Sequence, residues 1–276
     1  MNLQAVWIDG APGDTVPVDD RGLMYGDGLF ETILCREAAP RFLGQHLARL
    51  AAGCAALGIE TPDAGLLAAE IRQAAALAAD GVVRLVVTRG SSPQRGYAPP
   101  AHSRPRRIIA RYPLPPAMAA DSGGIRACHS PVHAGLSPQL AGIKHLNRLE
   151  NVLARARLAG SGCAEAIMSL HTGELVGGTQ SNLFVRLEGR LLTPAIELAG
   201  VRGVMRGVVL REAARLGLEV VECRLRPADL SSAEEIFFCN VRVGIWPVRE
   251  LEGWRAGRDP GEVATALRAR IDHLHD

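Results

Sequence analysis

The chain has 276 residues, with 31 Lys and Arg against 29 Asp and Glu, and 47% of its residues are hydrophobic. This composition predicts a packed core and excludes wholesale disorder, and the near balance of charge offers no large footprint for nucleic acid or an acidic membrane. The N-terminus has no basic stretch followed by an apolar one, and no apolar run approaches the roughly 18 residues of a membrane span. Six scattered cysteines without a C-x-x-C pair, and no H-E-x-x-H, indicate reduced thiols and no metal site. We therefore expect a cytoplasmic globular protein without nucleic-acid or membrane partners.

Strand and helix patterns alternate through the first 113 residues. The predicted strands cover residues 3–9, 28–35, 82–88 and 108–112, and the predicted helices cover 43–57 and 63–79. Asp63 is well placed as the N-cap of the second helix. Residues 89–107 are rich in Gly, Ser, Pro and Arg, which predicts a long surface loop. Loops of that length in a compact domain are usually functional or disordered.

Residues 113–124 have little periodicity and many prolines and glycines, which predicts a domain boundary. The expected organisation is an α+β protein with an N-terminal α/β domain at 1–113, an interdomain linker at 114–124 and a C-terminal domain at 125–276. In the C-terminal domain, a hairpin is predicted around Glu188-Gly189. Further strands are predicted at 125–130, on both sides of the turn at 171–173, at 218–225 and at 235–239, and helices at 147–159, at 204–216 and after residue 260. A cleft between domains is the default ligand site of such a protein.

Lys144 is the only lysine of the chain. It follows the apolar residues 140–143 and precedes a predicted helix. The apolar face of that helix is formed by Leu146, Leu149, Leu153 and Ala156. An apolar setting disfavours the charged ammonium and favours Schiff-base chemistry. A snorkelling or ion-paired lysine near a helix start is the alternative, and a GC-rich coding bias would also replace lysine by arginine, so the local pattern leaves both interpretations open.

Several separate stretches, in the right order, resemble the fold-type IV pyridoxal-phosphate enzymes. They are residues 20–22 (DRG), 25–32 (YGDGLFET), 46–50 (HLARL) with Phe42, and 178–184 (GTQSNLF). That superfamily contains branched-chain and D-amino-acid aminotransferases and the aminodeoxychorismate lyases. Residues 140–150 (LAGIKHLNRLE) are similar to the lyase branch in particular, and residues 89–91, 95–97, 238–240 and 244–248 agree with it. The resemblance runs from about residue 8 to 248. It implies a two-domain architecture with a smaller N-terminal α/β domain and a larger pseudo-barrel domain that binds pyridoxal 5'-phosphate.

The resemblance also implies roles for individual residues. Lys144 matches the lysine that binds the cofactor covalently and later carries the proton, and Arg49 matches the arginine that grips the phosphate. Val204 and Met205 match backbone amides at a helix start that hold the phosphate, as a helix N-terminus suits an anion. Asn240 is assigned to the cofactor site through the 238–240 match. Three arginines are candidates for the substrate carboxylates, and each is equally explained as a surface arginine: Arg89, Arg95 and Arg148.

One position departs from the family pattern. Relatives place a glutamate five residues before the asparagine that here is Asn182, and its carboxylate faces the pyridine nitrogen. This chain has Gly177 there. A carboxylate would keep the ring nitrogen protonated and deepen the electron sink. Glu174 lies three residues earlier, at the wrong distance and on the opposite face of an extended chain.

The resemblance therefore implies a lyase that converts 4-amino-4-deoxychorismate to 4-aminobenzoate and pyruvate, a step of folate biosynthesis, and that acts as a homodimer on a small-molecule substrate. Because aromatisation drives this elimination, it tolerates a weaker electron sink than transamination does, so Gly177 favours the lyase. Two alternatives remain open from the sequence. One is an aminotransferase of the same fold that acts on D- or branched-chain amino acids, and the other is a weakly active or non-catalytic cofactor-binding homologue.

Overall fold

The computed structural model describes residues 3–93, 95–114, 123–256 and 261–274. These form two compact units, which are described separately below. The first contains the described residues up to 114 together with Ile143–Asn147, and the second contains residues from 123 to Gly142 and from Arg148 onward. The short segment that carries Lys144 therefore packs with the N-terminal unit, although it is flanked in sequence by the second unit.

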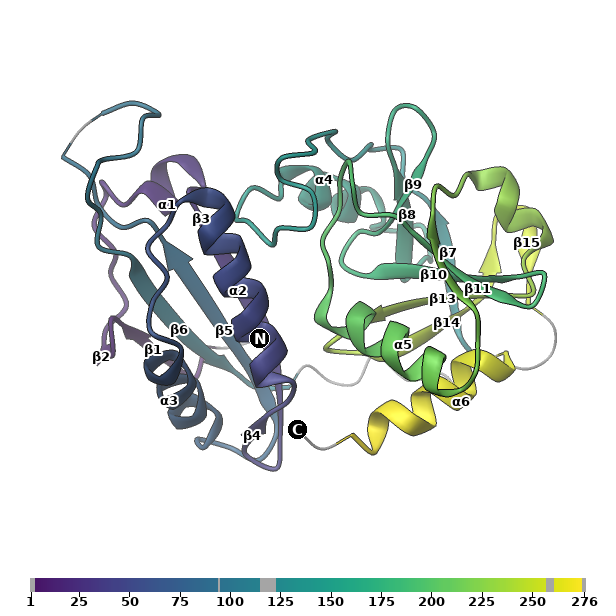
Figure 1. Cartoon of the computed structure of the whole chain (residues 1–276), viewed down its shortest axis with the longest axis horizontal. Helices are drawn as coiled ribbons and strands as arrows, with labels where there is room; N and C mark the ends of the chain where they lie inside the picture. The colour runs from purple at the N-terminus through teal and green to yellow at the C-terminus, as the bar shows by residue number, and fades with distance from the viewer. Residues whose placement is uncertain (1–2, 94, 115–122, 257–260, 275–276) are drawn as a thin grey trace. The chain divides into compact units, whose positions relative to one another are not determined.

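The first unit is a six-stranded sheet with two long helices on one face (Figure 1). The strand order is β2-β1-β6-β5-β3-β4, and all neighbouring strands are antiparallel. The strands are β1 (Ala5–Ile8), β2 (Ala11–Pro12), β3 (Gly28–Arg36), β4 (Ala39–Pro40), β5 (Gly81–Thr88) and β6 (Arg106–Tyr112). The helices are α1 (Arg21–Tyr25), α2 (Leu43–Leu57) and α3 (Ala64–Ala75).

Local sequence signals set the ends of α2 and α3. Helix α2 has the predicted bounds and ends at Gly58, whose φ of 60° is the left-handed conformation that glycine adopts most easily. Helix α3 begins after Asp63, whose carboxylate accepts a hydrogen bond from the Leu66 amide at 2.7 Å, as predicted for an N-cap. Both helices pack on the alternate residues of β3 that form the core, Leu29 and Ile33 among them. Because side chains alternate along a strand, Glu31 points to the same helix-covered face.

The second unit is built on a nine-stranded mixed sheet with the order β12-β11-β10-β13-β14-β7-β8-β9, and β15 pairs with β14. Its strands are β7 (Ile125–His129), β8 (Glu165–Ser169), β9 (Leu175–Gly178), β10 (Asn182–Leu187), β11 (Arg190–Pro194), β12 (Val220–Cys223), β13 (Glu235–Asn240), β14 (Gly244–Leu251) and β15 (Trp254–Arg255). Its helices are α4 (Leu149–Arg157), α5 (Val204–Arg215) and α6 (Glu262–Asp272), with a 3-10 helix at Pro227–Ser232. The predicted hairpin is confirmed: Glu188 and Gly189 both have positive φ, as a two-residue turn between twisted strands requires.

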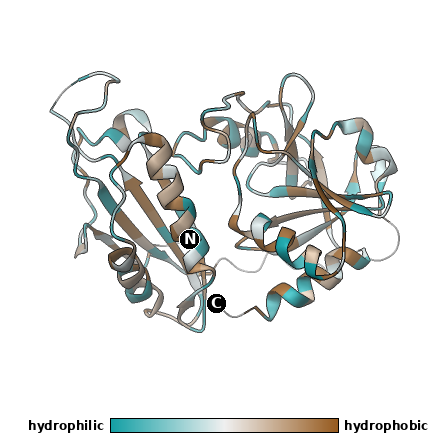
Figure 2. Ribbon diagram, viewed as in Figure 1, coloured by the Kyte–Doolittle hydropathy of each residue, from teal (hydrophilic) through white to brown (hydrophobic). Residues whose placement is uncertain are grey.

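The core of each unit is formed mainly by its central strands, and β5, β13 and β14 are largely hydrophobic (Figure 2). Helix α6 is joined to β13 through Glu235, whose buried carboxylate accepts hydrogen bonds from the amides of Val263 and Ala264 at 3.0 and 3.1 Å. These two amides belong to the first turn of α6 and have no partner within the helix, so Glu235 acts as its cap. Among the described residues, no helix is long and apolar enough to cross a membrane.

The apolar face of α4 is exposed. Leu149 is 77% exposed and Leu153 55%, and Val152 beside them is 59% exposed. The buried residue of the helix is Ala154, on the opposite side. Helical spacing determines which residues share a face, but it does not determine which face meets the sheet.

Candidate active site

The backbone around Lys144 is held by the free edge of β3. The Phe30 amide donates to the Lys144 carbonyl at 3.0 Å, and the Leu146 amide donates to the Gly28 carbonyl at 3.0 Å. Leu29 and His145 lie opposite each other in this short antiparallel bridge. The close approach of this segment to β3 requires glycine at position 28, because a Cβ there would lie 2.5 Å from the Val87 carbonyl oxygen and 2.9 Å from the Leu146 side chain. The sheet edge therefore fixes the position of the lysine backbone.

The Lys144 side chain lies over an aromatic ring. Its Nζ is 4.0 Å from the centroid of the Phe30 ring, and the guanidinium carbon of Arg84 is 4.3 Å from the same centroid. Both cations are attracted by the negative face of the ring. Lys144 is half-buried. Burial lowers the pKa of Arg84, although Tyr112 acts in the opposite direction. The amine thus lies on a segment that is paired with β3 and against an apolar ring.

Arg49 of α2 is held by the buried carboxylate of Glu31. Arg49 Nε donates to Glu31 Oε1 at 2.8 Å, and Arg49 Nη2 donates to Glu31 Oε2 in a second, short contact. His46 Nδ1 contacts Glu31 Oε2 at 2.6 Å. Burial raises the pKa of Glu31, but hydrogen bonds from His46 and Arg49 more than offset this and hold the pKa below its usual value. Glu31 is therefore ionised at neutral pH and can only accept hydrogen bonds, so His46 carries its proton on Nδ1.

The same group of side chains keeps His46 neutral. Burial lowers the pKa of His46, the hydrogen bond to Glu31 opposes this shift, and the positive charges of Arg49 and Lys144 add to the lowering. The structure thus brings two predicted residues, Lys144 and Arg49, into one electrostatic environment in the first unit. Arg49 binds the Glu31 carboxylate directly, and the positive charges of Arg49 and Lys144 both act on His46, so this positive environment suits an anionic ligand.

In the second unit, Val204 and Met205 form the first turn of α5. Gly203 is the N-cap, and because it has no side chain it cannot itself cap the first amides of the helix. The first amides of such a helix have no partner within it and carry the positive end of the helix dipole. The close approach of Asn182 requires glycine at position 203, since a Cβ there would lie 2.1 Å from Asn182 Oδ1. This helix start is therefore an arrangement of backbone donors that can hold a phosphate.

Asn240 lies at the same end of the sheet, because its neighbour Cys239 pairs with Asn182 across β10 and β13. Its side-chain Oδ1 accepts hydrogen bonds from the amides of Arg242 and Val243 at 2.9 and 3.1 Å. Its amide also donates to the Gln180 carbonyl at 3.3 Å. The Asn240 side chain thus shapes the turn between β13 and β14, and its role at the cofactor stays a prediction.

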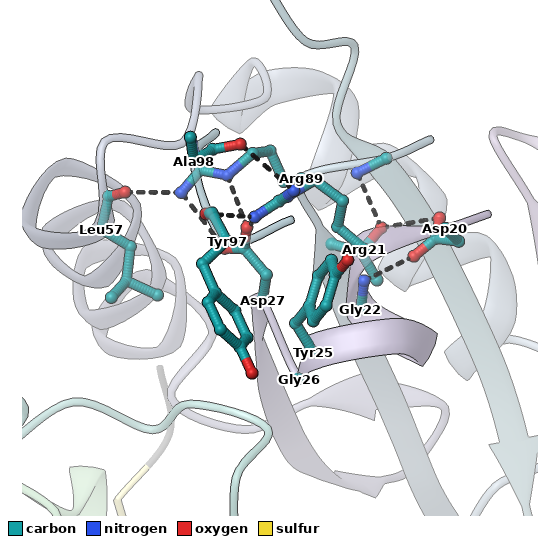
Figure 3. A network of polar contacts seen from close by, with 12 residues as sticks. Asp20, Arg21, Gly22, Tyr25, Gly26, Asp27, Leu57, Arg89, Tyr97 and Ala98 are labelled. Carbon is teal, nitrogen blue, oxygen red and sulfur yellow. Dashed lines mark hydrogen bonds and ion pairs between the residues drawn. The ribbon is translucent and has the colours of Figure 1, made fainter. Parts of the chain in front are cut away.

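The three predicted substrate arginines lie in different environments. Arg89 is 6% exposed and uses four hydrogen bonds inside the protein: two to the Asp27 carboxylate, at 2.7 and 3.1 Å, and two to carbonyls at the end of α2, at 2.7 and 2.6 Å (Figure 3). Arg95 is exposed in the long loop. Arg148 is the half-buried N-cap of α4, and burial lowers its pKa against the opposing effect of Glu150. Arg89 therefore differs from Arg95 and Arg148 because its guanidinium donors are used in hydrogen bonds that hold Asp27 and the end of α2.

The long loop after Arg89 is tied to the first unit by a residue that the sequence interpretation missed. The buried Arg21 donates to the carbonyls of Tyr97 and Gly96 at 2.9 and 3.1 Å and to Asp27 at 2.9 Å (Figure 3). Burial raises the pKa of Asp27, but hydrogen bonds and charge from Arg89 and Arg21 lower it below its usual value overall. Asp27 is thus the shared anchor of the two arginines.

Comparisons with known proteins decide the family. The family model described as amino-transferase class IV matches residues 28–251. The chain belongs to the amino-transferase class IV family. It is 31% identical to an aminodeoxychorismate lyase of Vibrio harveyi over 243 residues, which are 88% of this chain and 89% of that protein. It is 34% identical to a putative branched-chain-amino-acid aminotransferase of Methanocaldococcus jannaschii over 272 residues, 94% of this chain and 91% of that protein.

Solved structures agree with this family and with the expected fold-type IV architecture. The crystal structure of 4-amino-4-deoxychorismate lyase from Pseudomonas aeruginosa has a TM-score of 0.92 and 42% identity, with 98% of this chain and 99% of that chain covered. A branched-chain amino acid aminotransferase structure has a TM-score of 0.89 at 23% identity, covering 99% of this chain and 95% of that chain, and so shows the fold alone. Class IV aminotransferases depend on pyridoxal phosphate, so this chain is a pyridoxal-phosphate enzyme.

The residues present fit the cofactor in part. Taken by itself, the first unit contains an amine and a pre-positioned arginine, and the second unit, taken by itself, contains a helix start with backbone donors. The ring nitrogen is different, because β9 carries Gly177 where relatives carry a glutamate. Gly177 pairs with Met168 and Gly178 pairs with Ile167, so Glu165 lies on the face of Gly178 and not on that of Gly177. Glu165 is buried and accepts hydrogen bonds from Thr179 and Ser181 on that face. Within the described strands β8 and β9, no carboxylate replaces the missing one.

Proposed function

We propose that this protein is an aminodeoxychorismate lyase that converts 4-amino-4-deoxychorismate to 4-aminobenzoate and pyruvate in cytoplasmic folate biosynthesis. The observation that carries the proposal is the placement of the single lysine on the β3 edge, in one charged group with Arg49. The 42% identity to the Pseudomonas aeruginosa lyase supports this reaction over others of the family. The proposed domains are 1–113 and 125–276, joined by 114–124, most of which lies outside the described residues.

In this proposal, Lys144 binds the cofactor covalently through Nζ, and Arg49 holds its phosphate. The amides of Val204 and Met205 and the side of the sheet that carries Asn240 complete the cofactor site. Bound pyridoxal phosphate supplies an electron sink next to the substrate amine.

Lys144 acts as the base. With its Nζ released from the cofactor, it takes the proton from the amine-bearing carbon of the substrate and holds it at that nitrogen. The electron pair left on that carbon forms the new ring double bond, and the neighbouring carbon expels its enolpyruvyl ether oxygen. The expelled enolate takes up one proton at its methylene carbon, which balances the proton that Lys144 removed, and the products are pyruvate and aromatic 4-aminobenzoate. Because aromatisation drives the bond cleavage, this reaction suits a site with Gly177 in place of a carboxylate.

Arg95 and Arg148 are the proposed partners of the substrate carboxylates, because arginine binds carboxylates with two parallel hydrogen bonds. Arg89 was predicted in the same role. Its four hydrogen bonds to Asp27 and to the end of α2 support an indirect one instead, in which it holds the start of the loop that carries Arg95.

The protein is further proposed to act as a homodimer. The exposed stripe of α4, formed by Leu149, Val152 and Leu153, supports a second copy of this chain as its occupant, since contiguous exposed apolar residues usually mark an interface. Leu149→Glu with Leu153→Glu should convert the dimer to the 29.3 kDa monomer in light scattering. The matched control is Leu66→Glu, which alters an exposed leucine of α3. A wild-type protein that is monomeric at micromolar concentration would contradict the dimer.

The test of the reaction is pyruvate release from 4-amino-4-deoxychorismate, measured with Lys144→Ala as the control. Because the chain has one lysine, borohydride reduction should label one internal peptide in the wild type and none in the variant. An aminotransferase would instead convert its cofactor to the pyridoxamine form when given an amino acid alone. That conversion without pyruvate release would replace the lyase by the aminotransferase. Cofactor binding with neither activity would indicate a non-catalytic homologue.

A further inference from the structure

We propose that Glu31 and His46 form a buried pair whose function is to position Arg49 for the cofactor phosphate. The inference rests on the proposed function, because it takes Arg49 as the phosphate ligand. It assigns a role to two residues that lie in stretches resembling the fold-type IV enzymes but that were given no role from the sequence. Both are fully enclosed in the first unit: Glu31 is 1% exposed and His46 is 0% exposed.

The Glu31 carboxylate holds Arg49 at two points. Both oxygens of Glu31 bind Arg49, one from Nε at 2.8 Å and one from Nη2. Two parallel contacts of this kind fix the plane of a guanidinium as well as its position. An arginine side chain that is mobile before binding must be ordered when its ligand arrives, which weakens binding. In this protein folding has already ordered Arg49.

His46 contacts the same carboxylate. Its Nε2 is buried without a hydrogen-bond partner among the described residues, and its Nδ1 contacts Glu31 Oε2 at 2.6 Å. A buried imidazole with one unpartnered nitrogen is unfavourable by itself. Through Nδ1, however, His46 holds Glu31 Oε2, which is the oxygen that Arg49 Nη2 also binds. His46 thus acts on Arg49 through Glu31.

Positioning and simple electrostatics predict opposite effects of Glu31→Gln on the affinity for the phosphate. Arg49 and Lys144 carry two positive charges, Glu31 one negative charge, and His46 is neutral because its pKa is lowered by burial. Neutralising Glu31 would raise the net charge of the group from +1 to +2. By Coulomb's law alone, Glu31→Gln should therefore bind an anion more tightly. If Glu31 positions Arg49, the same substitution should bind the phosphate more weakly.

The experiment measures the affinities of the purified protein for pyridoxal phosphate and for pyridoxal, which reacts with the same amine but has no phosphate. We expect Glu31→Gln to weaken pyridoxal phosphate binding about three- to tenfold and to leave pyridoxal binding unchanged. His46→Leu should act in the same direction, and His46→Asn, which retains a donor near the Nδ1 position, should restore part of the loss. The matched control is Glu70→Gln, because Glu70 binds Arg107 of the same unit at two points, at 3.1 and 2.9 Å.

A second arm repeats Glu31→Gln in the Arg49→Ala protein. If Glu31 acts through Arg49, the substitution should there tighten phosphate binding or leave it unchanged. Equal or tighter binding of pyridoxal phosphate by Glu31→Gln with Arg49 present would overturn the inference, as would an equal loss for pyridoxal. If Glu31→Gln does not fold, His46→Leu is judged by the same ratio of affinities. A wild type that does not bind pyridoxal phosphate would instead refute the proposed function. An Arg49→Ala protein that binds it normally would reassign Arg49 and overturn the inference, while leaving the reaction to be tested by pyruvate release.

Discussion

Gly177→Glu tests the position at which this chain departs from its family. Gly177 has a φ of 153°, and a Cβ built there would lie 3.0 Å from the carbonyl oxygen of Ser181. A side chain in this region of backbone space costs about 1–3 kcal/mol. For a unit of this size, each kcal/mol corresponds to about 2–4 °C in melting temperature. We therefore expect any side chain at position 177 to lower the stability of the second unit.

The carboxylate should act in the opposite direction on the chemistry. A charge-assisted hydrogen bond to the ring nitrogen is worth about 1.5–3 kcal/mol, or roughly ten- to hundredfold in the rate of proton removal. The rate of transamination should rise more than the rate of the lyase reaction, because transamination is not driven by aromatisation and depends more on stabilisation of the carbanion. Gly177→Glu should thus give a less stable protein with faster side transamination.

Gly177→Ala is the control that separates the two effects, since it adds the Cβ without the carboxylate. Stability is measured by thermal unfolding, and the two rates are measured by pyruvate release and by conversion of the cofactor with an amino acid. If Gly177→Ala is as stable as the wild type, the argument from backbone strain is refuted. If a folded, cofactor-loaded Gly177→Glu protein has the same two rates as Gly177→Ala, the ring nitrogen does not limit this enzyme.

Three further predictions follow from contacts in the two units. Arg49→Ala should weaken cofactor binding roughly ten- to hundredfold, by loss of a contact worth about 1.5–3 kcal/mol, and unchanged affinity in a spectroscopic titration would reassign the residue. Asp27→Asn should lower the free energy of unfolding by about 1–3 kcal/mol at pH 7. The folded-state pKa of Asp27 is lowered from 3.8, so this stability difference should be present above pH 3.8 and disappear as the pH falls through the folded-state pKa. Denaturant unfolding that shows the same difference in strong acid would count against this prediction. Glu235→Ala removes the cap of α6 and should cost about 0.5–2 kcal/mol, with earlier amide exchange in α6 than in α5; uniform exchange would contradict the capping role.

Much of the local structure was determined by the sequence itself. The bounds of α2, the Asp63 cap and the Glu188-Gly189 turn depend on residues within a few positions of one another, so the local pattern contains the information needed. The family likewise followed from short stretches in the right order, and the same stretches marked Lys144 and Arg49.

Only the tertiary structure decided what surrounds those residues. The contacts that define the site join Glu31 to His46 and Arg49, 15 and 18 positions away, and Arg89 to Asp27, 62 positions away. One sequence signal was available: a glutamate at position 31 lies between core residues of an alternating strand, and a charge there needs a buried partner. Which partner it finds, and which face of α4 meets the sheet, depends on how separate elements pack, because side-chain spacing sets faces within an element but not the neighbours of those faces.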